Sequence, residues 1–203
     1  MNHRHILTII ALTLGLAACM GKPTRPSQFY LLSPDPGQPV ASRATATSPV
    51  SIGLGPVTLP EIYDRPQIVT RTDDNQINLA QFERWGGDLN KDLTRTLARN
   101  LMSRLNTDSV ALFPWSGRYK PDFQVTIRFF RLDGQLDEAV TLDGVWRLLD
   151  GSRGCELAAH RFEYQEQTTG AGYPELVDAM SRGVSRLSQK IAEEVASSQP
   201  DCE

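Results

Sequence analysis

Two long stretches of the chain repeat their apolar residues every three or four positions, the spacing of an α-helix with one buried face. The clearer stretch is 88–105, whose repeated apolar side chains are Leu89, Leu93, Leu97, Leu101 and Leu105. Asp88 is a residue type that caps helix starts, and Asn106 can adopt the left-handed turn that ends a helix. The second stretch is 174–196, with its proline in the first turn, where proline is tolerated. We therefore predict two long amphipathic helices.

Elsewhere the chain alternates apolar and polar residues with the period of two that marks a half-buried strand. Residues 123–129, 139–149 and 157–167 follow one another closely, which predicts an antiparallel meander. The shorter strand-like runs are 29–32, 50–59, 68–71, 76–80 and 110–113. Strands, a helix, more strands and a second helix make the order typical of an α+β protein. The predicted fold is a single domain in which a mainly antiparallel sheet packs against the two helices.

The first residues have the layout of a secretory signal. A short cationic start around Arg4 precedes an uncharged run of 13 residues at 6–18. A permanent membrane helix needs about 20 apolar residues, so the pattern predicts a removable signal peptide at residues 1–18. The sequence Leu-Ala-Ala-Cys at 16–19 resembles the bacterial lipobox, in which the cysteine sulfur accepts a diacylglycerol. The alternative is an ordinary secretory signal whose small residues happen to precede Cys19.

A lipidated Cys19 would hold the protein on a membrane, because two or three acyl chains bind almost permanently. The residue after Cys19 is Met20. In enterobacteria-like lipoproteins, aspartate at this position tends to retain the protein in the inner membrane. Methionine therefore points to the outer membrane, with the domain facing the periplasm. From Met20 to Pro49, inclusive, the chain has six prolines, a composition typical of a tether. Within this tether, 19–49, we expect an edge strand at 29–32 and a mobile loop at 38–48. The folded domain is predicted at 50–203.

Charge and cysteine content narrow the function classes. The 203 residues carry 21 Lys and Arg against 24 Asp and Glu, a net charge of −3, and the basic residues are scattered. No basic stripe of the kind that binds nucleic acid is visible. Besides Cys19, the chain has Cys155 and Cys202, an even pair in an oxidising periplasm, which predicts an intramolecular disulfide. Two unpaired thiols or an intermolecular bond are the alternatives.

Candidate catalytic and metal-binding residues are sparse. After residue 18 the only histidine is His160, which argues against a metal cluster and against a histidine-activated nucleophile, and no cofactor motif is present. Asp133 with Asp137 and Glu138 could pair as carboxylates do in glycoside hydrolysis. These acidic residues lie in a predicted turn, where they are common for structural reasons. The pattern favours a protein without enzymatic activity.

One segment carries a sequence signature that is more specific than the alternation of apolar and polar residues. Residues 59–71, read as Leu-Pro-Glu-Ile-Tyr-Asp-Arg-Pro-Gln-Ile-Val-Thr-Arg, are followed by Arg84 and Trp85 just before the first helix. This signature resembles that of the ABC-transport auxiliary lipoprotein family, which includes the PqiC-like subunits of MCE lipid-transport systems. The run at 29–32 and the Val-Trp pair at 145–146 fit the same family.

The resemblance implies an outer-membrane lipoprotein that meets an MCE-domain protein of the periplasm and helps apolar molecules cross between membranes. The candidate contact residues that it implies are Tyr63, Arg65, Pro66, Arg84 and Trp85. Each also has a structural interpretation, as a turn former, an ion-pair partner or a core side chain. Two other functions stay open, a lipid-tethered periplasmic hydrolase acting on cell-wall polymer and a purely structural lipoprotein. A homo-oligomeric ring around a tubular partner is an expectation by analogy.

Overall fold

The structure is a computed structural model that describes residues 25–35, 37–40, 49–73 and 75–200. The predicted signal peptide, Cys19, Cys202 and most of the predicted mobile loop lie outside these residues. In chain order the elements are β1 (Gln28–Tyr30), β2 (Ile52–Thr58), the short 3-10 helix η2 (Glu61–Tyr63), β3 (Gln67–Arg71), β4 (Ile77–Trp85), α2 (Leu89–Leu105), β5 (Val110–Leu112), β6 (Phe123–Gly134), β7 (Ala139–Asp150), β8 (Glu156–Gln167) and α3 (Tyr173–Ser197).

The strands form two sheets. The large sheet has the order β5-β2-β6-β7-β8, and the small sheet has the order β1-β4-β3. The antiparallel meander predicted for the three long strands is confirmed as β6-β7-β8. The α+β fold is confirmed as well, but the mainly antiparallel sheet is corrected: β2 runs parallel to both β5 and β6, and β1 runs parallel to β4. Residue alternation reports which face of a strand is buried and carries no information about the direction of its neighbours.

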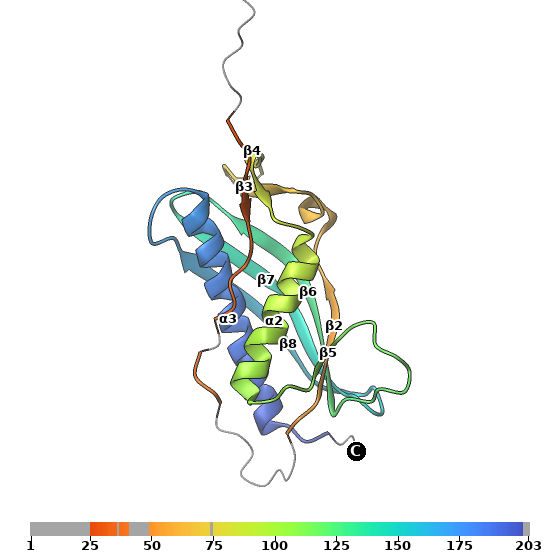
Figure 1. The fold of residues 1–203 in the computed structure, drawn as a ribbon. Helices are drawn as coiled ribbons and strands as arrows, with labels where there is room; N and C mark the ends of the chain where they lie inside the picture. Colours follow the sequence, from red (N-terminus) through yellow and green to blue (C-terminus); the bar gives the residue numbers. More distant parts are fainter. Residues whose placement is uncertain (1–24, 36, 41–48, 74, 201–203) are drawn as a thin grey trace, which may run out of the picture.

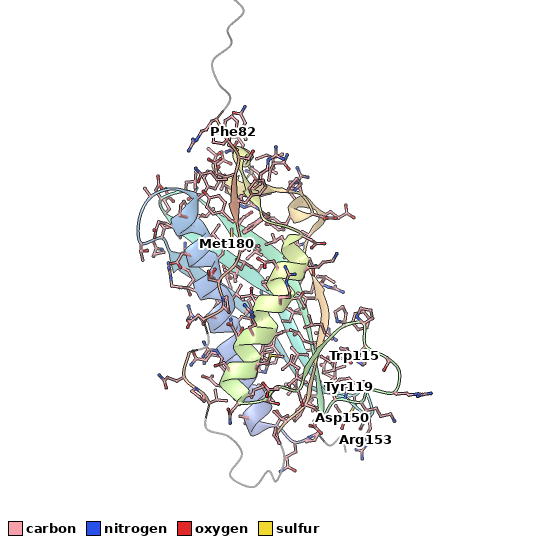
Figure 2. All side chains as sticks on the ribbon, viewed as in Figure 1. Phe82, Trp115, Tyr119, Asp150, Arg153 and Met180 are labelled. Carbon is pink, nitrogen blue, oxygen red and sulfur yellow. The ribbon has the colours of Figure 1, made fainter. Side chains whose placement is uncertain are left out.

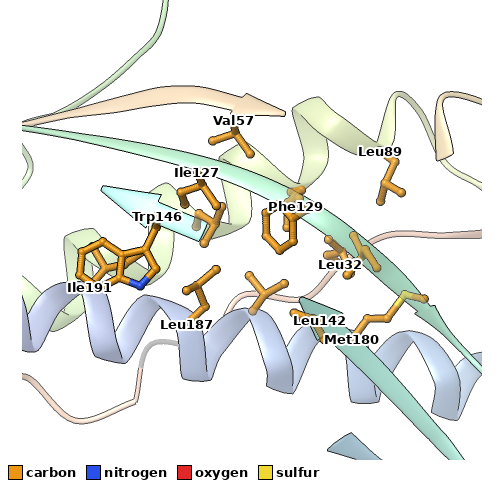
Figure 3. Close-up of a cluster of buried hydrophobic side chains, with 14 of the residues drawn as sticks. Leu32, Val57, Leu89, Ile127, Phe129, Leu142, Trp146, Met180, Leu187 and Ile191 are labelled. Atoms are coloured by element: carbon orange, nitrogen blue, oxygen red, sulfur yellow. The ribbon is translucent and has the colours of Figure 1, made fainter. Parts of the chain in front are cut away.

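Both helices lie on one face of the large sheet (Figure 1). The central leucines of α2, at 93, 97 and 101, are fully buried, as are Leu187 and Ile191 of α3. They meet Ile127, Phe129 and Trp146 of the sheet in one continuous apolar cluster (Figure 3). Each large side chain that is fully withdrawn from water contributes roughly 1.5–3 kcal/mol. The core of the protein therefore lies between the large sheet and the two helices.

Both caps predicted for the first helix are present. The Asp88 carboxylate accepts a hydrogen bond of 3.0 Å from the backbone N–H of Lys91, and Asn106 adopts a left-handed conformation with φ of 48°. Asn106 donates its backbone N–H to the carbonyl oxygens of Met102 and Ser103. The helix therefore begins and ends where its local sequence favours it.

Residues 31–35 and 37–40, which we call the strap, lie across the outer side of the two helices (Figure 1). The backbone N–H of Leu32 donates to Asp92 Oδ2 on α2 at 2.8 Å, and that of Ser33 donates to Ser181 Oγ on α3 at 3.0 Å. Ser185 Oγ donates to Asp35 Oδ2 at 2.9 Å. The proline-rich composition did not anticipate these contacts. They place the beginning of the folded body at β1, well before residue 50.

Candidate partner-binding site

The segment that carries the family-like signature forms η2, a tight link and β3. Tyr63 ends η2, and the backbone N–H of Arg65 donates to the Tyr63 carbonyl oxygen at 2.9 Å. The Pro66 carbonyl oxygen then accepts a hydrogen bond of 2.7 Å from the backbone N–H of Trp85. In the small sheet Gln67 is the register partner of Arg84. The structure therefore brings all five candidate residues together, although some twenty positions separate the two halves of the signature.

The centre of this region is Asp133 at the end of β6, whose side chain is 1% exposed. Its Oδ2 accepts hydrogen bonds from the Tyr63 hydroxyl at 2.9 Å and from Arg71 Nε at 2.8 Å. Its Oδ1 accepts a hydrogen bond of 2.7 Å from Arg131 Nε. The Tyr63 oxygen in turn accepts the backbone N–H of Leu132 at 3.3 Å. One buried carboxylate thus joins η2, β3 and β6, and we call this group the Asp133 cluster.

The surroundings of Tyr63 keep its hydroxyl protonated. Burial of the ring, and then the negative charge of Asp133, raise the pKa of Tyr63 from its ordinary value near 10 to about 12. A buried carboxylate is costly unless its oxygens are paired and hydrogen-bonded, and here both oxygens are. The cluster therefore specifies how the signature segment sits on the large sheet, while the net free energy it supplies is small compared with that of the apolar core.

The five candidate residues differ in what they offer to a partner. Tyr63 and Trp85 are buried, with 4% and 5% exposure, so they stabilise the site from inside the protein. Arg65 and Arg84 are half-buried and Pro66 is exposed. The Nε atoms of Arg65 and Arg84 are each buried without a hydrogen-bond partner among the described residues. The outward part of the site therefore consists of the two guanidinium groups and the proline between them in the chain.

A groove of about 290 Å³ lies beside the signature segment, between η2 and the start of α2. Its charged lining residues are acidic: Glu61, Asp64 and the helix cap Asp88. Arg65 directly follows the groove residue Asp64 in the chain, so this region carries charge of both signs. Charge of both signs suits recognition of a polar protein surface better than binding of an apolar molecule.

The acidic residues considered as a hydrolytic pair do not come together. Asp133 is buried in β6 rather than in a turn, and its oxygens are engaged in the cluster. Asp137 and Glu138 are exposed, and Asp137 Oδ1 accepts a hydrogen bond of 2.7 Å from the backbone N–H of Gly172. Within the described ranges, no group of three or more His, Cys, Asp or Glu side chains has the arrangement of a metal site.

Sequence reasoning missed the roles of Asp133, Arg71 and Arg131. The alternation of β6 places Phe123, Val125, Ile127 and Phe129 on the face that the helices cover. The ladder between β6 and β7 then shifts between Phe129 and Arg131, with Phe130 at the irregularity, so that Leu132 takes the helix-facing side. Asp133 therefore points to the opposite face, where the signature segment covers it. No signal in the local sequence marks this bulge.

His160 and Cys155 lie away from this site, on β8 and just before it. His160 stacks on Trp146 with ring centroids 4.6 Å apart, and its Nε2 lies 3.2 Å from Glu194 Oε2, so it is a surface residue with partners. Cys155 directly precedes β8. Cys202 lies outside the described residues, and the pairing of the two cysteines stays a prediction.

Comparison with known proteins decides the family. The family of ABC-type transport auxiliary lipoprotein components matches residues 30–192, most of the chain. The protein belongs to this family. The match runs from β1 through most of α3 and includes the whole signature segment, so the resemblance inferred from the signature is confirmed. Among curated proteins none matches the chain.

Solved structures share the fold of this auxiliary lipoprotein. A crystal structure of an uncharacterized protein has 21% identity and a TM-score of 0.68, covering 84% of this chain and 99% of its own. A protein from Xanthomonas campestris has 16% identity and a TM-score of 0.65, covering 84% and 95%. The PelC dodecamer from Paraburkholderia phytofirmans has 12% identity and a TM-score of 0.44, covering 75% and 95%. The last likeness is too weak to inform the assembly of this protein.

Membership in a lipoprotein family supports attachment to a membrane through a lipid. Among the described residues there is no helix with the length and apolar character needed to span a bilayer. As a component of an ABC-type transport system, the protein works with other subunits.

Proposed function

We propose that this protein is a non-enzymatic, outer-membrane-anchored auxiliary subunit of an MCE-type lipid transport system, and that it docks the periplasmic conduit and supports membrane integrity. The observation that carries the proposal is the family match over residues 30–192. The lipobox-like sequence that ends at Cys19 supports lipid anchoring, and Met20 supports the outer membrane. Anchoring leaves the folded body in the periplasm, where it can meet an MCE-domain protein.

Physical chemistry gives such a subunit a purpose. A diacyl lipid has roughly 30 methylene groups, and exposing them to water costs on the order of 20 kcal/mol at ~0.8 kcal/mol each. Lipid therefore crosses the periplasm inside a covered conduit. A subunit that is fixed to the far membrane raises the local concentration of a docking surface at the end of that conduit.

The docking surface that we propose is the outward part of the signature region, Arg65, Pro66 and Arg84. Arg65 directly follows Asp64 of the acidic groove in the chain, and the Asp133 cluster fixes the segment from η2 to β3 that carries Arg65 and Pro66. Arginine is enriched among the residues that dominate binding energy at protein interfaces. Tyr63 and Trp85 contribute by holding the backbone in place through buried contacts.

Site-specific photo-crosslinking in native envelopes tests this docking. With p-benzoylphenylalanine at exposed Pro66, we expect an adduct that contains an MCE-domain protein. The control position is Arg118, which is also exposed and lies in the loop next to Tyr119 at the other end of the molecule (Figure 2). An adduct of the same partner at both positions, or none at Pro66, would count against this surface.

Substitution separates docking from folding. Arg84→Ala should weaken capture of the MCE-domain protein roughly fivefold or more. This is the effect expected when an arginine that contributes more than about 1 kcal/mol to binding is removed from an interface. Arg118→Ala should leave capture unchanged. If Arg84→Ala lowers the unfolding temperature as strongly as it lowers capture, Arg84 has a structural role instead. The hydrolase alternative gains no support from the structure, because the acidic residues that prompted it do not converge.

A further inference from the structure

The end of the molecule at which the chain enters the fold carries exposed apolar side chains. Phe29 of β1 is 68% exposed, and Leu79 and Ile77 of β4 are 40% and 37% exposed. Phe82 lies at the same end (Figure 2). Leu79 and Ile77 precede the buried part of β4 and form one arm of the β3–β4 hairpin. We call Phe29, Ile77 and Leu79 the hairpin-end residues.

Strand direction relates these residues to the N-terminal anchor. β1 pairs in parallel with the last part of β4, with Gln28 opposite Glu83 and Tyr30 opposite Trp85. Because the two strands run the same way, the chain that leads into β1 comes from the side on which β4 begins. Ile77 is the first residue of β4. The hairpin and the incoming chain therefore extend from the body in the same direction.

The length of the tether and the length of the hairpin arm are similar, so the hairpin can reach the membrane that holds Cys19. From Cys19 to Gln28 there are 28 − 19 = 9 residue steps, which span at most roughly 30 Å when fully extended. A flexible chain of that length averages only about 17 Å between its ends. From Glu83 back to Ile77 there are 83 − 77 = 6 steps, about 20 Å of strand. The strap makes the tether this short, because residues 31–35 and 37–40 are held against the helices.

We propose that the hairpin end of the small sheet rests on the lipid bilayer that holds Cys19, with Phe29, Ile77 and Leu79 at the headgroup boundary. This inference rests on the proposed lipid attachment at Cys19. A bilayer surface fits three features together: side chains that are apolar yet exposed, their position at the anchored end, and a tether shorter than a small protein domain. The orientation leaves the opposite end, with Trp115 and Tyr119, facing the periplasm (Figure 2).

The contact is apolar rather than electrostatic. The hairpin turn carries Asp73, whose carboxylate accepts hydrogen bonds from the backbone N–H groups of Asn75 and Gln76, each at 2.8 Å. Exposed Arg25 lies 3.9 Å from Glu83 and is partly compensated by it. With acidic and basic groups both present, attraction to anionic lipid is weak, and the contact should persist when salt is raised.

Photo-crosslinking with the full lipidated protein tests the orientation. The protein is reconstituted in vesicles of phosphatidylethanolamine and phosphatidylglycerol, with p-benzoylphenylalanine replacing Phe29, Leu79 or Phe113. Phe113 is the matched control, because it is an exposed phenylalanine, 52% accessible, whose ring packs 5.6 Å from that of Trp115 at the opposite end. We expect adducts with the mass of a lipid when the probe replaces Phe29 or Leu79, and no such adducts when it replaces Phe113.

A longer tether provides a second variant that leaves the fold intact. A flexible Gly-Ser insertion between Lys22 and Arg25 should reduce lipid adducts at Leu79, because the effective concentration of the bilayer at the hairpin falls with tether length. Acylation of Cys19 should be unchanged. If adducts at Leu79 are insensitive to the insertion and equal to those at Phe113, the orientation is wrong.

The outcomes separate this inference from the proposed function. Acylated Cys19 without lipid adducts at Phe29 or Leu79 overturns the membrane contact alone. An unmodified Cys19 in the same sample overturns the anchoring and, with it, this contact. Lipid adducts at Leu79 together with a missing MCE adduct at Pro66 would keep the contact and reject the docking surface. A protein adduct at Leu79 in envelopes, in place of lipid, would identify the hairpin as a protein interface.

Discussion

The two sheets of this protein are held in place by different interactions. The large sheet packs through fully buried apolar side chains, such as Leu148 of β7 and Leu142 opposite Gly183 of α3. The small sheet also buries Ile68, Val69 and Trp85 in this core, but it exposes other apolar side chains and is in addition linked to the large sheet through the charged Asp133 cluster. Apolar burial is non-directional and supplies most of the folding free energy. A hydrogen-bonded ionic cluster supplies little net energy but fixes one geometry.

This difference indicates that the two sheets have different roles in the protein. The large sheet and its helices make a stable body, whereas the small sheet presents the signature residues and the hairpin end. A docking or membrane-contacting surface has to leave arginine and apolar side chains accessible, so it cannot be stabilised by burying them. The buried carboxylate adds a directional link that helps to keep such a surface rigid while its outward side chains stay accessible.

A large and local effect is expected from Asp133→Ala. Breaking a buried ion pair from one side costs about 3–5 kcal/mol, and the lower part of this range applies because the Arg71 and Arg131 side chains are 23% and 33% exposed and can reach water. We expect the signature segment to loosen first. Urea unfolding measures the loss, and hydrogen exchange in residues 61–85 measures the local opening.

Leu148→Ala provides the contrasting variant in the large sheet. Removing a fully buried leucine costs about 2–5 kcal/mol, and here the loss should be global, with protection falling in both helices and the meander. The comparison between the sheets fails if Asp133→Ala and Leu148→Ala change hydrogen exchange in the same pattern. Asp178→Ala on the exposed side of α3 serves as a surface control.

A smaller effect, with a distinctive pH dependence, is expected from Tyr63→Phe. Loss of the hydroxyl bond to Asp133 should cost about 1–3 kcal/mol near neutral pH. In the wild-type protein the raised pKa of Tyr63 means that its contribution is complete below pH 10 and is lost as pH rises through about 12. Denaturant unfolding from pH 9 to 12 should therefore show the variant and the wild type converging. A constant gap would mean that Tyr63 does not titrate as its burial requires.

The smallest effect is expected from Asp35→Ala in the strap. Its carboxylate accepts the Ser185 hydroxyl, and one such hydrogen bond contributes about 0.5–1.5 kcal/mol. Global stability should barely change, while proteolysis within residues 31–40 should become faster. Asp108→Ala, at an exposed position that is outside the strap, is the control. Unchanged proteolysis in Asp35→Ala would show that the strap is held mainly by the backbone bonds to Asp92 and Ser181.

The elements that rest on periodic burial were predictable. Both helices, the caps at Asp88 and Asn106, the meander and the short strand near residue 29 appear where the pattern places them, with boundaries that differ by a few residues. The main difference is β4, which continues as a strand to Trp85 instead of ending near Ala80. In the missed part, 81–85, one of the buried positions is the charged Glu83, so the apolar pattern stops while the strand continues.

The candidate site was predictable only in part. The signature named Tyr63, Arg65, Pro66, Arg84 and Trp85, and these residues do lie together. Which of them are buried could not be inferred, because burial of Tyr63 depends on a carboxylate 70 positions away in the chain. Asp133 was interpreted as a turn residue, since the bulge after Phe129 reverses the faces of β6 without a local signal.

Local preferences and periodic burial are properties of neighbouring residues, and they were enough to predict the helices and the meander. The family followed from the resemblance of the signature segment, and the lipid anchor at Cys19 stays a prediction. Strand direction, the burial of Asp133 and the docking of the strap depend on residues that are distant in the chain and meet only after it folds. Their energies come from contacts between those distant residues, and for this reason only the tertiary structure could decide them.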